Sequence, residues 1–506
     1  MIDMGNVRRM LNNNSAEDFV NDVDAIRLFS KPPVLNSSLI DGNKVLIGIR
    51  GAGKSMLLRC YYNFFLTLTL CELTRKQKVS YFPVLIKPKI INTATPEEIY
   101  HILLEEMKLG ISNTIERITD SHGKATWLED VFNIPLKCML KVPEFKKYAE
   151  EYFDEENVQF KYHDEFVYQK EVDGGYIKGF LNDFTFLLPK IADVKTPEEL
   201  NEKCFRNFVE HNIIEKFIFL IDDISSLNDD FYLSKGLFDG LLEGFRKCGC
   251  FQFIISVIQN SLAEVITNKK RDFFAAERIV YNLNSIEEIR NAREYIKELL
   301  KCFLNINDIH ELIEIDDLPF YNDQITDSKG DALEQLVYAS RALPRWIFTI
   351  LRSAIEKFRD YNGMEDIEPL CKDEIISIIK DYAVAKLSPM QVYKRYVTSL
   401  INVCSQHNTF KFSNENNNNA ILKSLVFNDE GDSCLLCEDE NYKNTQSKYA
   451  FNYAYCVLTD LPTHFNNIQN SIDNTRSILN GQWIDKSFKV NFNKRSDNFN
   501  FVGVND

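Results

Sequence analysis

Short apolar runs recur through the first 285 positions of the chain and are separated by longer segments with helical spacing. These runs predict buried strands at residues 45–47, 79–86, 217–221, 251–258 and 279–281. A continuously apolar run bounded by polar residues is typical of a strand covered on both faces. Because such strands alternate with helices, the pattern predicts an α/β fold with a parallel sheet flanked by helices.

Two helix starts carry the same four-residue pattern. Residues 95–98 and 196–199 both read Thr-Pro-Glu-Glu, which places Thr at the N-cap, Pro at the first helical position and Glu where it completes a capping box. The flanking residues do not match, so the pattern indicates shared helix-start chemistry and not an internal repeat. From Ser285 onward apolar residues recur every three or four positions, which predicts an all-helical lid extending to about residue 385.

The last 120 or so residues follow a different pattern. A helix is predicted near 390–404, strand-like runs at 409–412 and 434–437, and an aromatic-rich helix at 449–455. Helix, two-stranded wing and helix together predict a small α+β domain of winged-helix type.

The first predicted strand leads directly into a glycine-rich turn. Gly48 to Ser55 reads Gly-Ile-Arg-Gly-Ala-Gly-Lys-Ser, which matches the P-loop pattern without a mismatch. Backbone N–H groups of such a turn converge on an anion, and the following helix adds the positive end of its dipole. Lys54 is expected to reach the β- and γ-phosphates, and Ser55 to ligate Mg²⁺. The residues expected to contact the nucleotide are Gly48, Arg50, Gly51, Ala52, Gly53, Lys54, Ser55 and Met56.

A second acidic feature follows the strand predicted at 217–221. Asp222 and Asp223 come directly after this apolar run, as in a Walker B strand. A hard cation beside phosphate requires oxygen ligands, so Asp222 is expected to hold Mg²⁺, directly or through water. Asp223 is expected to orient the attacking water.

Three further groups are candidates for the same site. Asn260 follows the strand at 251–258, and ligands of open α/β sheets bind at the carboxyl ends of the strands. A simple turn asparagine is the alternative. The cations at 269–271 and Arg278 lie near this edge and would either complete the site of a neighbouring subunit or form a solvated basic turn. Arg345 follows Pro344 in a predicted first helical turn, from which a guanidinium can reach phosphate.

Four residues of the C-terminal region have spacings that resemble zinc ligands. Cys404 and His407 form one pair, and Cys434 and Cys437 form the other. The alternative is that these are ordinary residues, because Cys434 and Cys437 fall in an apolar run and cysteine is frequent in this chain.

Composition limits the other possibilities. The 506 residues are expected to form an N-terminal arm (1–42), a P-loop domain (43–284) with a helical insertion at about 115–185, the lid (285–385) and the C-terminal domain (386–506). A net charge of −15 argues against nucleic-acid binding over most of the surface. We find no targeting or membrane-spanning segment, and twelve irregularly spaced cysteines fit reduced thiols, so a cytoplasmic protein without a membrane partner is expected.

Taken together, the P-loop, Asp222-Asp223, Asn260 and Leu343-Pro344-Arg345 resemble the AAA+ ATPases of the origin-recognition/initiator clade and their bacterial ORC-like relatives. The resemblance implies that Asn260 is sensor 1, Arg345 sensor 2 and Arg271 an arginine finger. It also favours the winged-helix domain and implies a role in anti-phage defence.

Two departures from the family pattern are visible. Asp223 stands where a Glu is usual, as in STAND signalling ATPases, which implies slow turnover. No glycine precedes Leu343-Pro344-Arg345.

Three functions follow from these motifs. The first is a slow ATPase switch that uses ATP and Mg²⁺ and acts on an effector protein or as a homo-oligomer. The second is an ATP-dependent module that binds duplex DNA through a basic cluster at Lys486 to Arg495, with hydrolysis secondary. The third is a small-molecule phosphotransferase, against which stand the length of the chain and the lack of an acceptor-site motif.

Overall fold

The structure is a computed structural model. It describes residues 22–33, 35, 38–49, 51–88, 95–123, 129–171, 175–202, 206, 208, 213–222, 224, 242, 249–257, 274–279, 286–304, 332–358, 370–389, 391, 393–406, 409–414, 422, 425–426, 433–437, 447–461, 488–495 and 498–504.

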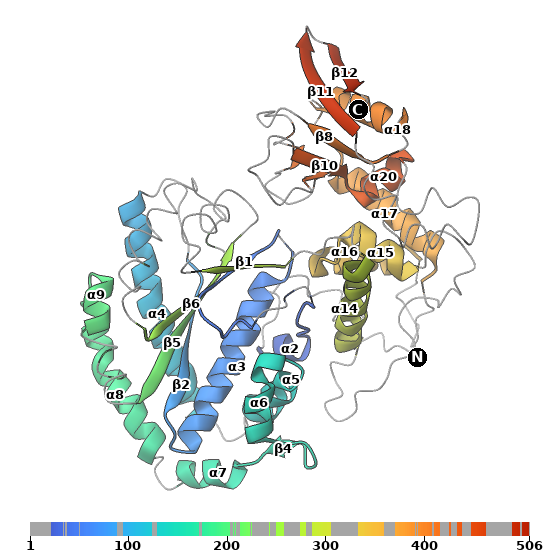
Figure 1. Cartoon of the computed structure of the whole chain (residues 1–506). Coiled ribbons are helices and arrows are strands. Elements are labelled where there is room, and N and C mark those ends of the chain that lie inside the picture. Colours follow the sequence, from blue (N-terminus) through green and yellow to red (C-terminus); the bar gives the residue numbers. More distant parts are fainter. Residues whose placement is uncertain are drawn as a thin grey trace. The chain divides into compact units, whose positions relative to one another are not determined.

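The chain divides into two compact units, whose elements are labelled in Figure 1. The P-loop unit comprises Ser15–Val280 and Asn305–Ile313. The C-terminal unit comprises Met1–Asn14, Tyr281–Leu304 and Glu314–Asp506.

A five-stranded parallel sheet forms the centre of the P-loop unit, in the order β2-β5-β6-β1-β7. Its strands are β1 (Lys44–Ile47), β2 (Val79–Ile86), β5 (Ile214–Ile221), β6 (Phe251–Val257) and β7 (Ala275–Arg278). Every residue of β1 and β6 is buried, which explains why these strands are almost continuously apolar in sequence. The predicted α/β fold with a parallel sheet is confirmed.

The strand register aligns the carboxyl ends of the three central strands. Ile47 of β1 is the partner of Val257 of β6, and Ile221 of β5 is the partner of Ile255. Because the strands are parallel, β1, β5 and β6 end at the same edge of the sheet. The glycine turn and Asp222, which follows β5, therefore meet at this edge.

Helix α3 (Lys54–Thr74) follows the glycine turn and is almost entirely buried. Helix α4 (Pro96–Gly123) begins with the predicted capping box, in which the Thr95 amide donates to Glu98 over 2.7 Å and the Glu98 amide donates to the Thr95 hydroxyl over 3.3 Å. The Thr114 hydroxyl of α4 donates to the Pro83 carbonyl of β2 over 2.8 Å. Both helices therefore pack against the sheet.

The segment between α4 and β5 is mostly helical. Its described elements are a π-helical turn η2 (Glu129–Asn133), α5 (Ile134–Met139), α6 (Pro143–Tyr152), β3 (Phe153–Asp154), β4 (Gln159–Phe160), α7 (His163–Glu171), α8 (Gly175–Ala192) and α9 (Pro197–Leu200). Strands β3 and β4 form an antiparallel hairpin, which the sequence analysis did not predict. Phe145 of α6 contacts Tyr61, Phe64 and Phe65 of α3 with ring centroids 5.1–5.4 Å apart, so this segment covers α3.

The N-terminal arm contributes one described helix, α2 (Asp22–Arg27). It ends before Lys31-Pro32-Pro33, where two prolines disfavour a helix.

The C-terminal unit combines helices with a second sheet. Its described helices are α14 (Ile286–Leu304), α15 (Ala332–Ser340), α16 (Pro344–Phe358), α17 (Lys372–Lys386), α18 (Lys394–Gln406) and α20 (Tyr453–Thr459). Its strands are β8 (Lys411–Asn414), β9 (Leu435–Cys437), β10 (Ser447–Phe451), β11 (Phe488–Arg495) and β12 (Asn498–Val504), in the order β12-β11-β8-β10-β9. Strand β11 runs parallel to β8, and the other neighbouring pairs are antiparallel.

Two sequence predictions for this unit are wrong. Residues 449–451 belong to strand β10 and not to a helix, and the helix begins only at Tyr453, where the Asn452 side chain caps it by accepting from the Ala454 amide over 3.0 Å. The aromatic residues of β10 alternate toward Phe412, a periodicity of two that the run of aromatics obscured. Strands β8 and β9 also form no two-stranded wing, because β10 lies between them.

The last strand of the parallel sheet is also displaced from its predicted position. Strand β7 covers Ala275–Arg278 instead of 279–281. The Ile279 amide continues the pairing by donating to the Ile47 carbonyl over 2.8 Å. Residues 280 and 281 lie outside the described part of the chain.

Candidate nucleotide site

The glycine turn depends on backbone conformations that side chains disfavour. Gly51 and Gly53 have φ angles of 83° and 84°, in the left-handed region that costs other residues about 1–2 kcal/mol. A Cβ atom on Gly48 would lie 3.2 Å from the Cβ of Ala52 and 3.3 Å from the Ile279 carbonyl oxygen. The turn therefore needs glycine at 51 and 53 for its conformation, and at 48 for its close packing.

Lys54 is the first residue of α3, and its side chain folds back over the turn. Its Nζ atom donates to the Gly48 carbonyl over 2.6 Å and to the Ile49 carbonyl over 3.1 Å. The residue is 8% exposed. An ammonium group with three donors that is held at the glycine turn is placed to exchange these carbonyl oxygens for those of an anion.

Ser55 and Asp222 are brought together from positions 167 residues apart. The Ser55 hydroxyl donates to Oδ1 of Asp222 over 3.1 Å. Asp222 is 5% exposed, and its amide is fixed to the end of β2 by donating to the Ile86 carbonyl over 2.9 Å. The hydroxyl and the carboxylate therefore face each other at the edge where the strands end.

A third side chain completes this group. The Ser256 hydroxyl of β6 donates to the same Oδ1 of Asp222 over 2.8 Å, and Ser256 is fully buried. Ser256 was not predicted, because ligand-binding side chains are expected at the carboxyl-terminal tip of this strand and not in its interior. The signal was present, since Ser256 and Gln252 are the polar residues of an otherwise apolar strand.

The donor set fits a magnesium ion. Mg²⁺ prefers oxygen ligands and is usually bound by one or two carboxylates together with substrate phosphates and water. Ser55 and Asp222 supply a hydroxyl and a carboxylate whose oxygens are 3.1 Å apart. No larger set of protein ligands is needed for such a site, because the nucleotide supplies the remaining oxygens.

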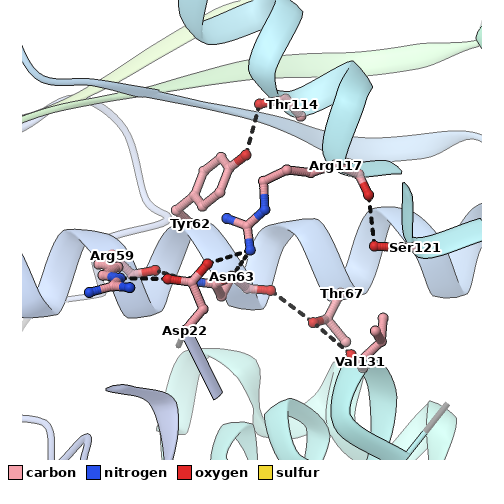
Figure 2. A network of polar contacts seen from close by, with 9 residues as sticks. All are labelled: Asp22, Arg59, Tyr62, Asn63, Thr67, Thr114, Arg117, Ser121 and Val131. Atoms are coloured by element: carbon pink, nitrogen blue, oxygen red, sulfur yellow. Dashed lines mark hydrogen bonds and ion pairs between the residues drawn. The ribbon is translucent and has the colours of Figure 1, made fainter. Parts of the chain in front are cut away.

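A polar network anchors the helix that carries Lys54 and Ser55 (Figure 2). The Asp22 carboxylate of α2 lies between Arg59 of α3, at 2.5 Å, and Arg117 of α4. Arg117 also donates to Oδ1 of Asn63 over 3.0 Å. Burial alone would raise the pKa of Asp22, but Arg117 and Arg59 outweigh it and hold the pKa below its ordinary value.

A second contact joins the arm to the segment that covers α3. Lys31 donates to Oε2 of Glu144 over 2.8 Å, and the Tyr61 hydroxyl of α3 donates to Oε1 of the same carboxylate. Helix α3 is thus fixed on several sides, which holds its N-terminus in a constant orientation toward the glycine turn.

The remaining predicted residues are placed as follows. Arg50, Asp223, Asn260 and Arg271 lie outside the described residues. Met56 follows Ser55 in the first turn of α3 and is half-buried. Arg345 is exposed in the first turn of α16, in the C-terminal unit, so its reach to phosphate remains a prediction.

The zinc-like cysteines behave as core residues where they are described. Cys404 and Cys434 are buried free thiols, and burial raises both pKa values, that of Cys434 to about 12. His407 and the side chain of Cys437 lie outside the described part of the chain. Among the described residues, no group of three or more His, Cys, Asp or Glu side chains is arranged to hold a metal ion.

The P-loop unit has the fold of a P-loop NTPase. This conclusion follows from the parallel sheet, the glycine turn after β1 and the carboxylate after β5 that contacts the hydroxyl next to Lys54. Within the described residues, no helix combines the length and apolar character needed to cross a bilayer.

Comparisons with known proteins find similar chains among solved structures only. No family model and no curated protein sequence matches the chain. The Walker-type ATPase PABY2304 of Pyrococcus abyssi is similar in structure, with 12% identity over 88% of this chain and 97% of the other and a TM-score of 0.33. The ORC2 protein of Aeropyrum pernix, solved in ADPNP–ADP complexes, has 10% identity over 90% and 97% and a TM-score of 0.34. Both TM-scores lie below 0.5, so a function for this chain has to be inferred from its own residues.

Proposed function

We propose that the chain is an ORC-like AAA+ ATPase that binds ATP with Mg²⁺ at the glycine turn and hydrolyses it slowly. The observation that carries the proposal is the 3.1 Å contact between Ser55 and Asp222 directly beside the turn. A glycine loop without a nucleotide-binding role is not expected to have a buried carboxylate in contact with the hydroxyl that follows its lysine. This pair is the one expected to hold the metal of a bound nucleotide.

Each residue then has a defined task. Backbone N–H groups of the turn and the N-terminus of α3 bind the phosphates, and Lys54 exchanges the carbonyls of Gly48 and Ile49 for phosphate oxygens. Ser55 and Asp222 hold Mg²⁺, which neutralises charge that develops on the phosphate oxygens. Asp223 orients the attacking water.

Three further residues are proposed to complete the site. Asn260 senses the terminal phosphate, Arg345 reaches it from the helical lid, and Arg271 acts on a neighbouring subunit. A short Asp at 223 in place of a Glu supports slow turnover and hence a switch in which hydrolysis resets the lid. The protein would then act through a homo-oligomer or an effector partner.

The decisive experiment is a Lys54→Ala variant. We expect its affinity for a labelled ATP analogue to fall at least tenfold, because one charge-assisted contact to phosphate contributes on the order of 1.5–3 kcal/mol. The matched control is Lys146→Ala, which removes one exposed cation whose ion pair with Glu150 spans 3.7 Å. Lys146→Ala should bind like the unmodified protein, and unchanged binding by Lys54→Ala would refute the site.

A second candidate function is ATP-dependent binding of duplex DNA by the C-terminal region. Residues 386–506 carry twelve Lys and Arg against twelve Asp and Glu, so the whole net charge of −15 falls on residues 1–385. Three of the cations, Lys489, Lys494 and Arg495, lie on strand β11. The C-terminal region is therefore the part of the chain that an anionic polymer would approach with least repulsion.

A further inference from the structure

The sequence motifs assign no role to Ser256, yet its buried hydroxyl contacts the Asp222 carboxylate. Its donor–acceptor distance to Oδ1 of Asp222 is 2.8 Å, shorter than the 3.1 Å from Ser55 to the same oxygen. We infer that Ser256 is a positioning residue that holds the Asp222 carboxylate in the orientation required for Mg²⁺. This inference rests on the proposed function.

The two hydroxyls differ in their surroundings. Ser55 is partly exposed and belongs to the turn that receives the nucleotide, whereas Ser256 is 0% exposed within β6. Ser55 is itself a proposed metal ligand, so its hydroxyl oxygen gains a second partner when Mg²⁺ binds. Ser256 can keep its hydrogen bond throughout, because it is buried in β6 and does not belong to the turn that receives the nucleotide.

This arrangement has an energetic reason. A hydrogen bond to an ionised carboxylate is stronger than one between neutral groups. A carboxylate that a buried hydroxyl already holds in one rotamer needs less ordering when the metal binds. Partners of metal-ligating carboxylates act in this way, and their removal typically costs about 10–100-fold in metal affinity.

Strand β6 has two polar residues, Ser256 and Gln252. A structural role accounts for Gln252 but not for Ser256. Gln252 lies toward the opposite end of the strand, where its Nε2 donates to the carbonyls of Leu39, at 3.1 Å, and Gly42, at 2.8 Å. That contact fastens a loop. Ser256 instead points its hydroxyl at the one carboxylate that the motifs assign to the metal.

The test uses the full chain and a fluorescent ATP analogue, titrated in EDTA and then at increasing Mg²⁺. For Ser256→Ala we expect unchanged affinity in EDTA and an Mg²⁺ midpoint raised about tenfold. Ser256→Thr keeps the hydroxyl and should restore the midpoint. Gln252→Leu is the matched control, since it removes a buried polar group from the same strand and should lower thermal stability without moving the midpoint.

Each outcome decides a separate point. An Mg²⁺ midpoint for Ser256→Ala equal to that of the unmodified protein overturns the inference while leaving the proposed function intact. Equal weakening with and without Mg²⁺ also overturns it, because it shows a general effect on the fold. If the unmodified protein binds no nucleotide, the proposed function fails and Ser256 has no metal ligand to position.

Discussion

Gly51 and Gly53 adopt left-handed backbone conformations. The conformation of Gly53 sets the direction in which the following residues, Lys54 and Ser55, leave the turn. Gly53 has φ 84° as the N-cap of α3, so a Cβ atom at this position strains the residue that immediately precedes Lys54. We expect such strain to reach the two side chains on which the proposed nucleotide binding depends. A single backbone angle is therefore part of the site.

Gly53→Ala tests this point. We expect it to lower the free energy of unfolding by about 1–2 kcal/mol and to weaken nucleotide binding at least tenfold. The control is Gly42→Ala, because Gly42 has φ 83° and a Cβ atom added there would meet no atom within 4 Å. Gly42→Ala should lose similar stability in chemical denaturation but bind nucleotide normally. Normal binding by both variants would show that the turn tolerates the strain.

Glu72 of α3 is a buried carboxyl group with an unusual pKa. Burial raises its pKa from 4.5 to about 7, against the hydrogen bonds from Ser80 that lower it, and Glu151 and Glu215 raise it further. Its Oε2 accepts from the Ser80 amide over 2.9 Å. The folded state therefore binds a proton more tightly here than the unfolded state does.

The sign of the pH effect follows from linkage. Between pH 4.5 and about 7 the folded protein holds more protons at Glu72 than the unfolded chain, so stability is lost as pH rises through this window. In Glu72→Gln we expect the loss to disappear, which leaves the variant more stable than the unmodified protein by roughly 3 kcal/mol at pH 8 but not at pH 4.5. Denaturant midpoints measured from pH 4.5 to 8 check this, and parallel curves would contradict it.

At the scale of elements, α4 approaches β2 closely at Gly110. A Cβ atom on Gly110 would lie 2.7 Å from Cγ1 of Val84 and 2.9 Å from the Leu85 carbonyl oxygen. The helix lies this close because no side chain intervenes. Thr114, one turn later, uses the same proximity to donate to the Pro83 carbonyl over 2.8 Å.

Gly110→Ala should separate α4 from β2. Ala is the better helix former by about 1 kcal/mol, but overpacking against backbone costs typically 1–3 kcal/mol, so we expect net destabilisation. The control is Gly179→Ala in α8, where a Cβ meets nothing within 4 Å. That change should stabilise by roughly 0.5–1 kcal/mol. Urea denaturation of both variants measures the difference, and stabilisation by both would contradict the close approach.

At the scale of the whole molecule, charge is divided unevenly along the chain. Residues 386–506 are formally neutral, whereas the remainder carries the full −15. Such a division favours local contact with an anionic polymer and disfavours contact elsewhere.

If the basic cluster of the C-terminal region contacts duplex DNA through about three phosphates, binding should weaken roughly 40-fold between 50 and 200 mM salt. Replacing Lys489, Lys494 and Arg495 with Gln should remove both the binding and its salt dependence. Replacing the exposed Lys380 of α17 with Gln serves as the control. An absence of binding at low salt with ATP present would eliminate this function.

Local sequence patterns predicted a structural element correctly wherever the contacts that determine it are close in sequence. The capping box at Thr95 and Glu98, the glycine turn and the strand at 79–86 were predicted because each depends on neighbouring residues. The aromatic run at 449–451 was assigned to the wrong element because its partners, β8 and β9, lie elsewhere in the chain. Burial by distant partners outweighs local propensity in such segments.

By itself, the sequence predicted which residue types would meet an anion and a metal ion, since glycine spacing, lysine, hydroxyl and carboxylate carry that chemistry wherever they lie. Only the tertiary structure decided that β6 lies between β1 and β5. That order brings Ser256 to Asp222, as the fold also brings Gly110 to β2 and buries Glu72. An apolar run specifies that a strand is buried but not which strands pair with it, because hydrophobic burial is non-directional.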